Sequence, residues 1–309
     1  MRVVPGVFSF LQQRMIQRLK RRDFTMKRTS IICIAVVIIT CCECPGGTDT
    51  SVVPSTDAIP AEEFSNIAPT VKTKTSKVNV FCPTSNEEAR TLYNGALEFE
   101  RQGKDDEAKE GYLKAIEKDP RYCDAMDNIG QMFRRNGDIN QAIYWYQHSI
   151  AVKPDNSVAH QNLAVAYRIK GDVDKTLGEY QWLVSNDPGN PEGYYGLGLA
   201  FLDRGQSTTA IKALKRAEEL YRANASPFLG DAQYLLGVSF YDQKDYRNAR
   251  DYLMLSYPSR KEDPDTNYLL GLCYLDPSIK DSGKAREYLL KAQQFGMKVS
   301  PELFQELEK

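Results

Sequence analysis

Side chains that commonly carry chemistry are few in this chain. Its 309 residues include two histidines, His148 and His160, and neither belongs to an HExxH zinc motif. The sequence also contains no glycine-rich phosphate loop and no GxSxG nucleophile motif. Both histidines fall on predicted helices, and His160 takes an inward or half-inward position, so we expect both to pack rather than to catalyse. We therefore predict no catalytic residue, no cofactor and no metal site.

The seven cysteines do not have the spacing of a metal site. Four of them lie within or directly after one short apolar segment, namely Cys33, Cys41, Cys42 and Cys44. The other three, Cys82, Cys123 and Cys273, lie far apart, with no CxxC motif among them. In an oxidising compartment Cys82 would be able to pair with Cys123, since a flexible segment can fold back over the intervening residues. The alternative is that both thiols stay free.

The stretch 123–156 shows the pattern on which most of the chain is built. Its first half places Met126 and Phe133 on one apolar helical face, and Gly137 is suited to the left-handed conformation that ends a helix. Its second half has a second apolar helical face, which Pro154 ends. The pattern predicts two helices that form a hairpin with one apolar side.

This pattern recurs with a period of 34 residues. The copies span residues 89–122, 123–156, 157–190, 191–224, 230–263 and 264–299. Five extra residues at 225–229 separate the fourth and fifth copies, and an insertion at 276–278 lengthens the turn of the sixth. Paired helices at this period resemble the tetratricopeptide repeat family. The resemblance implies an all-α, right-handed α-solenoid of about six hairpins.

Residues 300–309 follow the last copy and begin with a helix-start signal. Ser300 is suited to the N-cap position and Pro301 to the first helical turn. We expect a short C-terminal helix that covers the exposed end of the solenoid, which spans residues 86–309.

Residues 26–44 resemble a bacterial lipoprotein signal peptide. Lys27 and Arg28 precede an apolar run at 31–39, which is too short to span a bilayer, and cysteines follow directly. We expect a lipid on Cys41 or Cys42. Thr40 departs from the small residue usual before the lipidated cysteine, so cleavage by an ordinary signal peptidase, or no cleavage, stays open.

The segments on either side of this signal have different roles. The signal makes Met26 the expected start, with residues 1–25 as upstream sequence; a membrane-surface helix at 18–22 is the alternative. Residues 45–85 contain five prolines and show no helical or strand period. We expect a disordered tether, about 35 Å in root-mean-square length.

The family resemblance also implies a binding surface. In this family the first helix of each hairpin lines a concave groove that grips peptides or helices. The predicted groove residues are Tyr93, Arg101, Arg134, Arg135, Arg168, Tyr195, Asp203, Tyr234, Tyr241, Asp242, Tyr268 and Asp276. Basic residues gather in the N-terminal half and acidic residues with tyrosines in the C-terminal half. The alternative is that the charges are only solvated and the tyrosines fill the joints between hairpins.

One known activity of the family is not expected here. The carboxylate clamp that binds chaperone tails needs lysine and asparagine at defined groove positions. This chain has Tyr93 and Asp127 where the lysine belongs, and Leu97 and Gln131 where an asparagine belongs. We therefore do not predict binding of chaperone C-terminal tails.

Charge and layout together predict a binding function. The formal net charge is −1, which does not suggest a nucleic-acid partner. We expect a non-enzymatic, lipid-anchored scaffold in the bacterial cell envelope, on the periplasmic face or the cell surface, that binds a protein or peptide. Its layout is similar to that of the pilot lipoproteins of type IV pilus secretins. The alternative is a surface-exposed adhesin, whose arginines would grip sulfated glycans.

Overall fold

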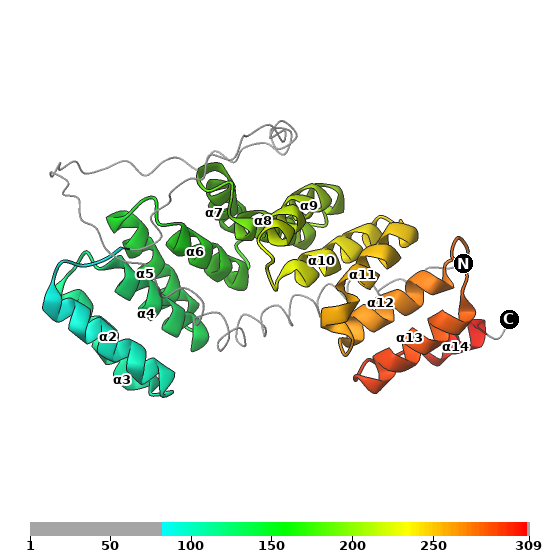
Figure 1. Cartoon of the computed structure of the whole chain (residues 1–309), viewed down its shortest axis with the longest axis horizontal. Helices are drawn as coiled ribbons and strands as arrows, with labels where there is room; N and C mark the ends of the chain where they lie inside the picture. The colour runs from blue at the N-terminus through cyan, green and yellow to red at the C-terminus, as the bar shows by residue number, and fades with distance from the viewer. Residues whose placement is uncertain (1–81, 308–309) are drawn as a thin grey trace. The chain divides into compact units, whose positions relative to one another are not determined.

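The computed structural model describes residues 82–307, and this part of the chain is helical (Figure 1). Six hairpins follow one another along it. They are α2 (Glu87–Arg101) with α3 (Asp105–Lys118), α4 (Cys123–Arg135) with α5 (Ile139–Val152), α6 (Ser157–Lys170) with α7 (Val173–Asn186), α8 (Pro191–Asp203) with α9 (Ser207–Ala223), α10 (Leu229–Asp242) with α11 (Tyr246–Arg260), and α12 (Pro264–Leu275) with α13 (Ser282–Gln294). A short helix, α14 (Pro301–Glu306), ends the series. The predicted all-α solenoid of six hairpins with a C-terminal helix is confirmed.

Several predictions fall outside the described residues. The signal segment 26–44, its cysteines Cys41 and Cys42, and most of the tether 45–85 are among them, and they stay predictions. Among residues 82–307, no helix combines the length and the apolar character that crossing a bilayer requires.

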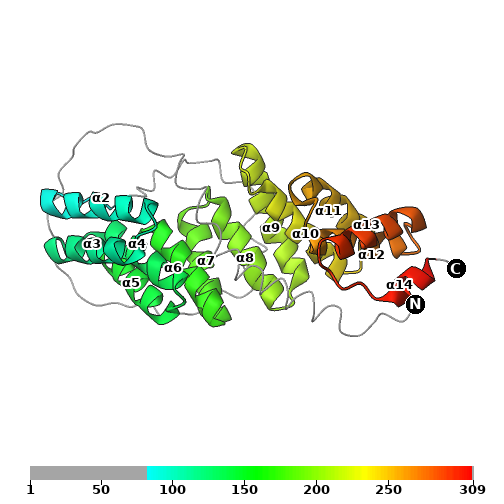
Figure 2. The same cartoon turned by 90° about the horizontal axis from the view of Figure 1, so that it is seen from below.

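The two helices of a hairpin do not occupy equivalent places in the stack. From α4 to α12, each first helix also contacts the first helix of the next hairpin, whereas the second helices show no comparable contact along the described chain. The first helices therefore lie on the inner side of the stack, and we call the surface that α2, α4, α6, α8, α10 and α12 present the inner face. Figures 1 and 2 show the hairpins following one another from α2 and α3 at one end to α13 at the other.

Polar side chains and glycines set the helix ends. The Oδ1 atom of Asn156 accepts a hydrogen bond from the backbone N–H of Ala159 at 3.3 Å, which caps α6. Gly171 ends the same helix in the left-handed conformation, with φ of 87°. Other helices begin with the same kind of side-chain cap, at Asn86, Asp138, Asp172, Asn190, Asp245, Asp263 and Asp281. These turn residues divide the apolar pattern into separate helices.

A small residue in each first helix allows the two helices of a hairpin to approach closely. A Cβ atom built on Gly130 in α4 would lie 2.6 Å from the ring of Tyr146 in α5, which is fully buried. Gly271 in α12 meets Leu289 in α13 in the same way, at 2.7 Å. The packing of these two hairpins therefore depends on the absence of a side chain at this position, which is alanine in the first and third hairpins and glycine in the others.

The two irregular copies differ as the sequence predicts. The second helix of the fourth hairpin, α9, is 17 residues long and runs to Ala223, because no proline stops it at Arg222. In the sixth hairpin the turn from α12 to α13 takes up residues 276–281. The first irregularity lengthens a helix and the second lengthens a turn, and both hairpins keep two packed helices.

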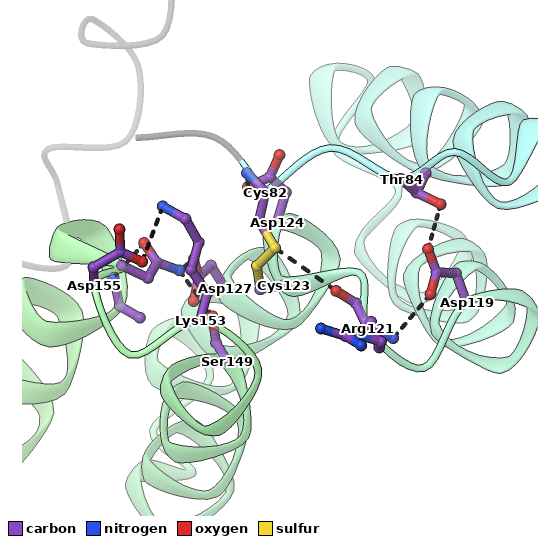
Figure 3. The surroundings of a disulfide bond; sticks show 12 residues. Cys82, Thr84, Asp119, Arg121, Cys123, Asp124, Asp127, Ser149, Lys153 and Asp155 are labelled. Atoms are coloured by element: carbon purple, nitrogen blue, oxygen red, sulfur yellow. Dashed lines mark hydrogen bonds and ion pairs between the residues drawn. A yellow bond between two sulfur atoms is a disulfide. The ribbon is translucent and has the colours of Figure 1, made fainter. Parts of the chain in front are cut away.

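A disulfide joins Cys82 to Cys123, so the structure shows pairing rather than two free thiols (Figure 3). The two Cα atoms are 5.5 Å apart, a usual separation for a disulfide. The backbone N–H of Cys82 donates to Oδ1 of Asp124 at 2.9 Å, and the Thr84 hydroxyl donates to the Asp119 carboxylate. The segment before α2 is thereby fixed to the start of α4. We call residues 82–86 the strap.

Glycine-to-alanine substitutions test the packing at the hairpin joint. Gly130→Ala should lower the free energy of unfolding by about 1–3 kcal/mol, because the new methyl group overlaps the Tyr146 ring. Gly95→Ala is the matched control, since nothing lies within 4 Å of a Cβ at that site. It should raise stability by about 0.5–1 kcal/mol through helix propensity. Chemical denaturation measures both, and effects of equal sign would contradict the packing account.

Removal of the strap disulfide tests its contribution to stability. Cys82→Ser opens a loop of 41 residues and should cost about 4 kcal/mol by chain entropy. In a solenoid this loss should be local, so amide hydrogen exchange should rise in α2 and α3 and stay unchanged in α10 and α11. Reducing agent should have the same effect on the wild type and none on the variant. Equal protection of α2 in both proteins would show that the strap does not stabilise the first hairpin.

Candidate functional site

Two of the predicted groove arginines bind carboxylates of the neighbouring hairpin. Arg135 of α4 forms an ion pair with Glu100 of α2. Arg168 of α6 holds Asp203 of α8 with two hydrogen bonds, from Nε to Oδ2 at 2.7 Å and from Nη2 to Oδ1 at 3.4 Å. Each pair joins residues 35 apart in the sequence, at neighbouring first helices. The basic and acidic halves predicted from the sequence are therefore not separate, because Arg168 and Asp203 neutralise each other.

The other two predicted arginines make no ion pair across a joint. Arg101 is exposed and pairs with Glu98 of its own helix at 2.8 Å. Arg134 is half-buried, and its Nε atom is buried without a hydrogen-bond partner. Its charge acts on the buried phenol of Tyr146 and opposes the rise that burial causes in the pKa of that group. Only these two arginines keep a charge that the neighbouring first helix does not offset.

Tyr93 fills a joint. Its ring packs against Tyr112 and Tyr122, with centroids 5.6 Å and 4.9 Å away. Its hydroxyl accepts a hydrogen bond from Nδ2 of Asn128 at 3.0 Å. Burial raises the pKa of Tyr93 to about 12. The joint-filling alternative thus describes Tyr93 better than a role in contacting a partner.

The equivalent position of the second hairpin also serves a joint. Asp127 is buried and accepts a hydrogen bond from Nδ2 of Asn156 at 2.8 Å. The same amide donates to the hydroxyl of Ser149 at 2.9 Å, so one network connects α4, α5 and the N-cap of α6. Burial raises the pKa of Asp127 to about 7.

The last three hairpins share a pattern that the first three lack. Their first helices carry EGYYGLGLAFLD at 192–203, DAQYLLGVSFYD at 231–242 and DTNYLLGLCYLD at 265–276. In each segment the first residue is acidic, the fourth is tyrosine, the seventh is glycine and the twelfth is aspartate. None of the three contains lysine or arginine. The twelfth residue of the corresponding segments in the first three hairpins is Arg101, Arg135 and Ile169.

The tyrosines of these segments are fixed by aromatic and cationic neighbours. Tyr234 lies beneath the guanidinium of Arg260, which is 3.8 Å from the ring centroid. Tyr195 is half-buried, Tyr268 is buried, and burial raises the pKa of both phenols. Tyr241 is half-buried too, and its ring contacts that of Tyr246 edge-on at 5.3 Å. Tyr234 and Tyr268 are thus buried, whereas Tyr195 and Tyr241 keep part of their surface exposed.

The aspartates of the three segments have different surroundings. Asp203 is held by Arg168, as described above. Asp242 accepts a hydrogen bond from the Ser207 hydroxyl at 3.2 Å, and burial raises its pKa to about 7. Asp276 caps α12 and accepts a hydrogen bond from the backbone N–H of Ser278 at 2.9 Å. No lysine or arginine among residues 82–307 forms an ion pair with Asp242 or Asp276.

Sequence reasoning missed Arg260, which lies at the end of the second helix α11. It is buried, and it contacts Oδ1 of Asp231 at 2.8 Å and Oδ2 of Asp263 at 2.9 Å. The repeat frame assigns groove positions to first helices, and Arg260 lies on a second helix. Sequence reasoning also missed Glu100, although its charge is opposite to that of Arg135 and it lies 35 residues earlier, which was a usable signal.

The two histidines differ in their surroundings. His160 is buried and stacks on Trp182, with ring centroids 3.5 Å apart. Its Nδ1 atom lies 2.6 Å from Oε2 of Glu179, and its Nε2 atom lies 3.0 Å from the carbonyl oxygen of Pro154. His148 is exposed and its ring lies 3.9 Å from that of Tyr144. The position of His160 agrees with the packing role expected from the sequence, whereas His148 lies at the surface.

Comparison with protein families finds matches in the repeat region. Models described as "Tetratricopeptide repeat" match residues 162–226 and 195–265, and a further model with that description matches 112–144. A model described as "TPR repeat" matches residues 130–171. No curated protein sequence matches this chain.

Solved structures share the fold at low sequence identity. PilF of Pseudomonas aeruginosa has a TM-score of 0.61 and 17% identity, and the match covers 72% of this chain and 97% of that one. A chain of the Cut9–Hcn1 hetero-tetramer of APC/C has a TM-score of 0.59 and 18% identity, over 81% of this chain and 46% of that one. YrrB, described as a TPR protein with an unusual peptide-binding site, has a TM-score of 0.50 and 18% identity, over 64% of this chain and 97% of that one.

A charge swap tests the ion pair between the third and fourth hairpins. Arg168→Glu places a carboxylate against Asp203 and should lower the free energy of unfolding by about 1–3 kcal/mol. Arg168→Glu with Asp203→Arg should recover a large part of this loss. Arg101→Glu is the control at an exposed site and should change stability by less than about 0.5 kcal/mol. Denaturation of the single and double variants measures the coupling, and additive losses would show that the pair contributes nothing.

Proposed function

The repeats of this chain belong to the tetratricopeptide repeat family, and on that basis we propose that the protein is a non-enzymatic scaffold that binds a protein or peptide partner on its inner face. The main support is the combination of tyrosine at the fourth and aspartate at the twelfth position of the segment, which only α8, α10 and α12 share among the first helices of the six hairpins. Residues needed only for hairpin packing recur in all six hairpins, as the small residue facing the second helix does. Tyr93 supplies the tyrosine of this pattern in α2 as well, but aspartate at the twelfth position is confined to three consecutive hairpins and is therefore not required for the common hairpin packing.

The surroundings of the inner face support binding rather than catalysis. Tyr195 and Tyr241 keep part of their surface exposed and contact neighbouring rings, which lowers the entropy cost of contacting a partner. The fold is shared with YrrB, whose description names a peptide-binding site. The paired state of Arg135 and Arg168 favours the scaffold over the glycan-binding adhesin, because two of the arginines that would grip sulfate already bind carboxylates.

We place the scaffold in the bacterial cell envelope, anchored by a lipid on Cys41 or Cys42. The Cys82–Cys123 disulfide supports this placement, because disulfides persist in oxidising compartments and are rare in the reducing cytosol. Assembly of envelope complexes is the role that suits a tethered binding scaffold. A surface-exposed ligand-binding protein is the alternative role in the same compartment.

A photo-crosslinking residue tests the binding face. Placed at Tyr241 on the first helix α10, it should give a discrete protein adduct in cells that express the full chain. Placed at Leu255 on the second helix α11, which is 54% exposed, it should give none. The partner would be identified by mass spectrometry and its binding confirmed with purified protein. Adducts from Leu255 and not from Tyr241 would overturn the proposed inner-face function.

A second experiment addresses the compartment. Metabolic lipid labelling of the wild type, Cys41→Ser and Cys42→Ser should show that one of these substitutions abolishes the label. Protease treatment of intact cells should spare the repeats if they lie in the periplasm and digest them if they lie on the surface. Absence of label from the wild type would remove the lipid anchor from the proposal.

A further inference from the structure

We infer that the inner face of α8, α10 and α12 binds an extended partner segment in which basic residues recur every third position, with apolar residues between them. This inference rests on the proposed function and names the chemistry of the partner. We call this surface the acidic tyrosine face, and its members used below are Tyr241, Asp242, Leu272, Leu275 and Asp276.

The repetition of the pattern defines the spacing of the partner. Equivalent residues of α10 and α12 lie on helices that contact each other, and packed helices have axes about 8–10 Å apart. An extended polyproline II segment advances about 3.1 Å per residue and turns once in three residues. Every third side chain of such a segment therefore points the same way and advances by about one hairpin. Equivalent positions on successive hairpins would meet equivalent residues of the partner.

Charge determines what those partner residues are. The three segments contain no lysine or arginine, so their own helices supply only negative charge. Arg168 offsets Asp203, whereas Asp242 and Asp276 form no ion pair with a lysine or arginine among residues 82–307. Arg247 donates to the carbonyl oxygen of Ser278 at 3.0 Å, in the turn that Asp276 begins, and Arg250 pairs with Asp251 at 2.6 Å, so neither arginine forms an ion pair with Asp276. Two partner cations three residues apart would supply the counter-charges for Asp242 and Asp276.

The environment of Asp242 makes an incoming cation favourable. The carboxyl is half-buried beside Tyr241, with the Ser207 hydroxyl as its hydrogen-bond donor, and its burial raises the pKa to about 7. Burial without a counter-charge disfavours the ionised form, and a lysine or arginine nearby reverses this preference. Binding of a basic segment should therefore release a proton near neutral pH and tighten as Asp242 ionises.

Half-buried apolar side chains of this protein are the reason that we expect apolar residues between the partner's cations. Leu272 and Leu275 of α12 and Tyr241 of α10 each retain part of their surface exposed. Aromatic and aliphatic contacts of this kind add binding free energy that charge alone does not supply. The partner segment therefore has apolar residues between its basic residues and is not uniformly basic.

A labelled peptide tests the inference on the full-length protein. The probe is a fluorescein-labelled nonapeptide of three Lys-Pro-Leu triplets, and fluorescence anisotropy measures its dissociation constant. Asp242→Asn with Asp276→Asn should weaken binding about tenfold or more, since both substitutions remove charge and retain shape. The matched control is Glu107→Gln with Glu117→Gln on the exposed side of α3, which removes the same charge and should change binding less than about twofold.

Two further arms address spacing and pH. A nonapeptide of the same composition with its three lysines adjacent should bind at least about fivefold more weakly, because one hairpin spans about three residues. Wild-type affinity should rise between pH 6 and pH 8 as Asp242 ionises, and Asp242→Asn should flatten this rise. Circular dichroism melts of each variant verify that the fold is retained.

The outcomes separate the inference from the function on which it rests. Equal weakening by the control pair would reduce binding to general charge attraction and overturn the inference, as would unchanged binding in the double aspartate variant. In either case a crosslink from Tyr241 to a cellular partner would leave the inner-face function standing. Selective weakening by the aspartate variants together with the spacing effect would establish the acidic tyrosine face as a site for basic segments.

Discussion

The architecture depends on one constraint, namely that each hairpin has an apolar side that only the next hairpin can cover. Within a hairpin, a small residue such as Gly130 brings the first helix against a large buried side chain such as Tyr146. That contact leaves the apolar surface on the other side of the hairpin exposed, and stacking against the next hairpin buries it. Because every hairpin repeats this contact, the chain grows in one direction, and the first helices are brought together on one face.

Polar contacts at the joints use up much of the charge on that face. Arg135 binds Glu100, Arg168 binds Asp203, and Asp127 belongs to a network with Asn156. Each of these contacts joins one hairpin to the next, and the desolvation of buried charges offsets part of the stability that such pairs contribute. What remains for a partner is the part of the inner face that the joints leave unused.

The fold was predictable from the sequence to a greater extent than the site. The 34-residue period, the caps and the turn glycines are local signals, so the hairpins and even the long helix α9 follow from them. Groove residues chosen by repeat position do lie on first helices, but position alone does not reveal their partners. Glu100 reaches Arg135 across a joint, and Arg260 reaches Tyr234 from a second helix. The first contact depends on how neighbouring hairpins are rotated relative to each other, and the second on how the two helices of one hairpin pack, and no local pattern encodes either.

The strap changes the path along which force travels through the molecule. A pull on the chain before Cys82 passes through the disulfide directly into α4, and the first hairpin lies in a closed loop outside that path. Solenoids ordinarily fray from their terminal repeats, because these have a neighbour on one side only. Here the first hairpin carries no load and cannot be peeled away by tension from the N-terminal side. Mechanical unravelling must therefore begin elsewhere in the stack, while the first hairpin keeps its shape.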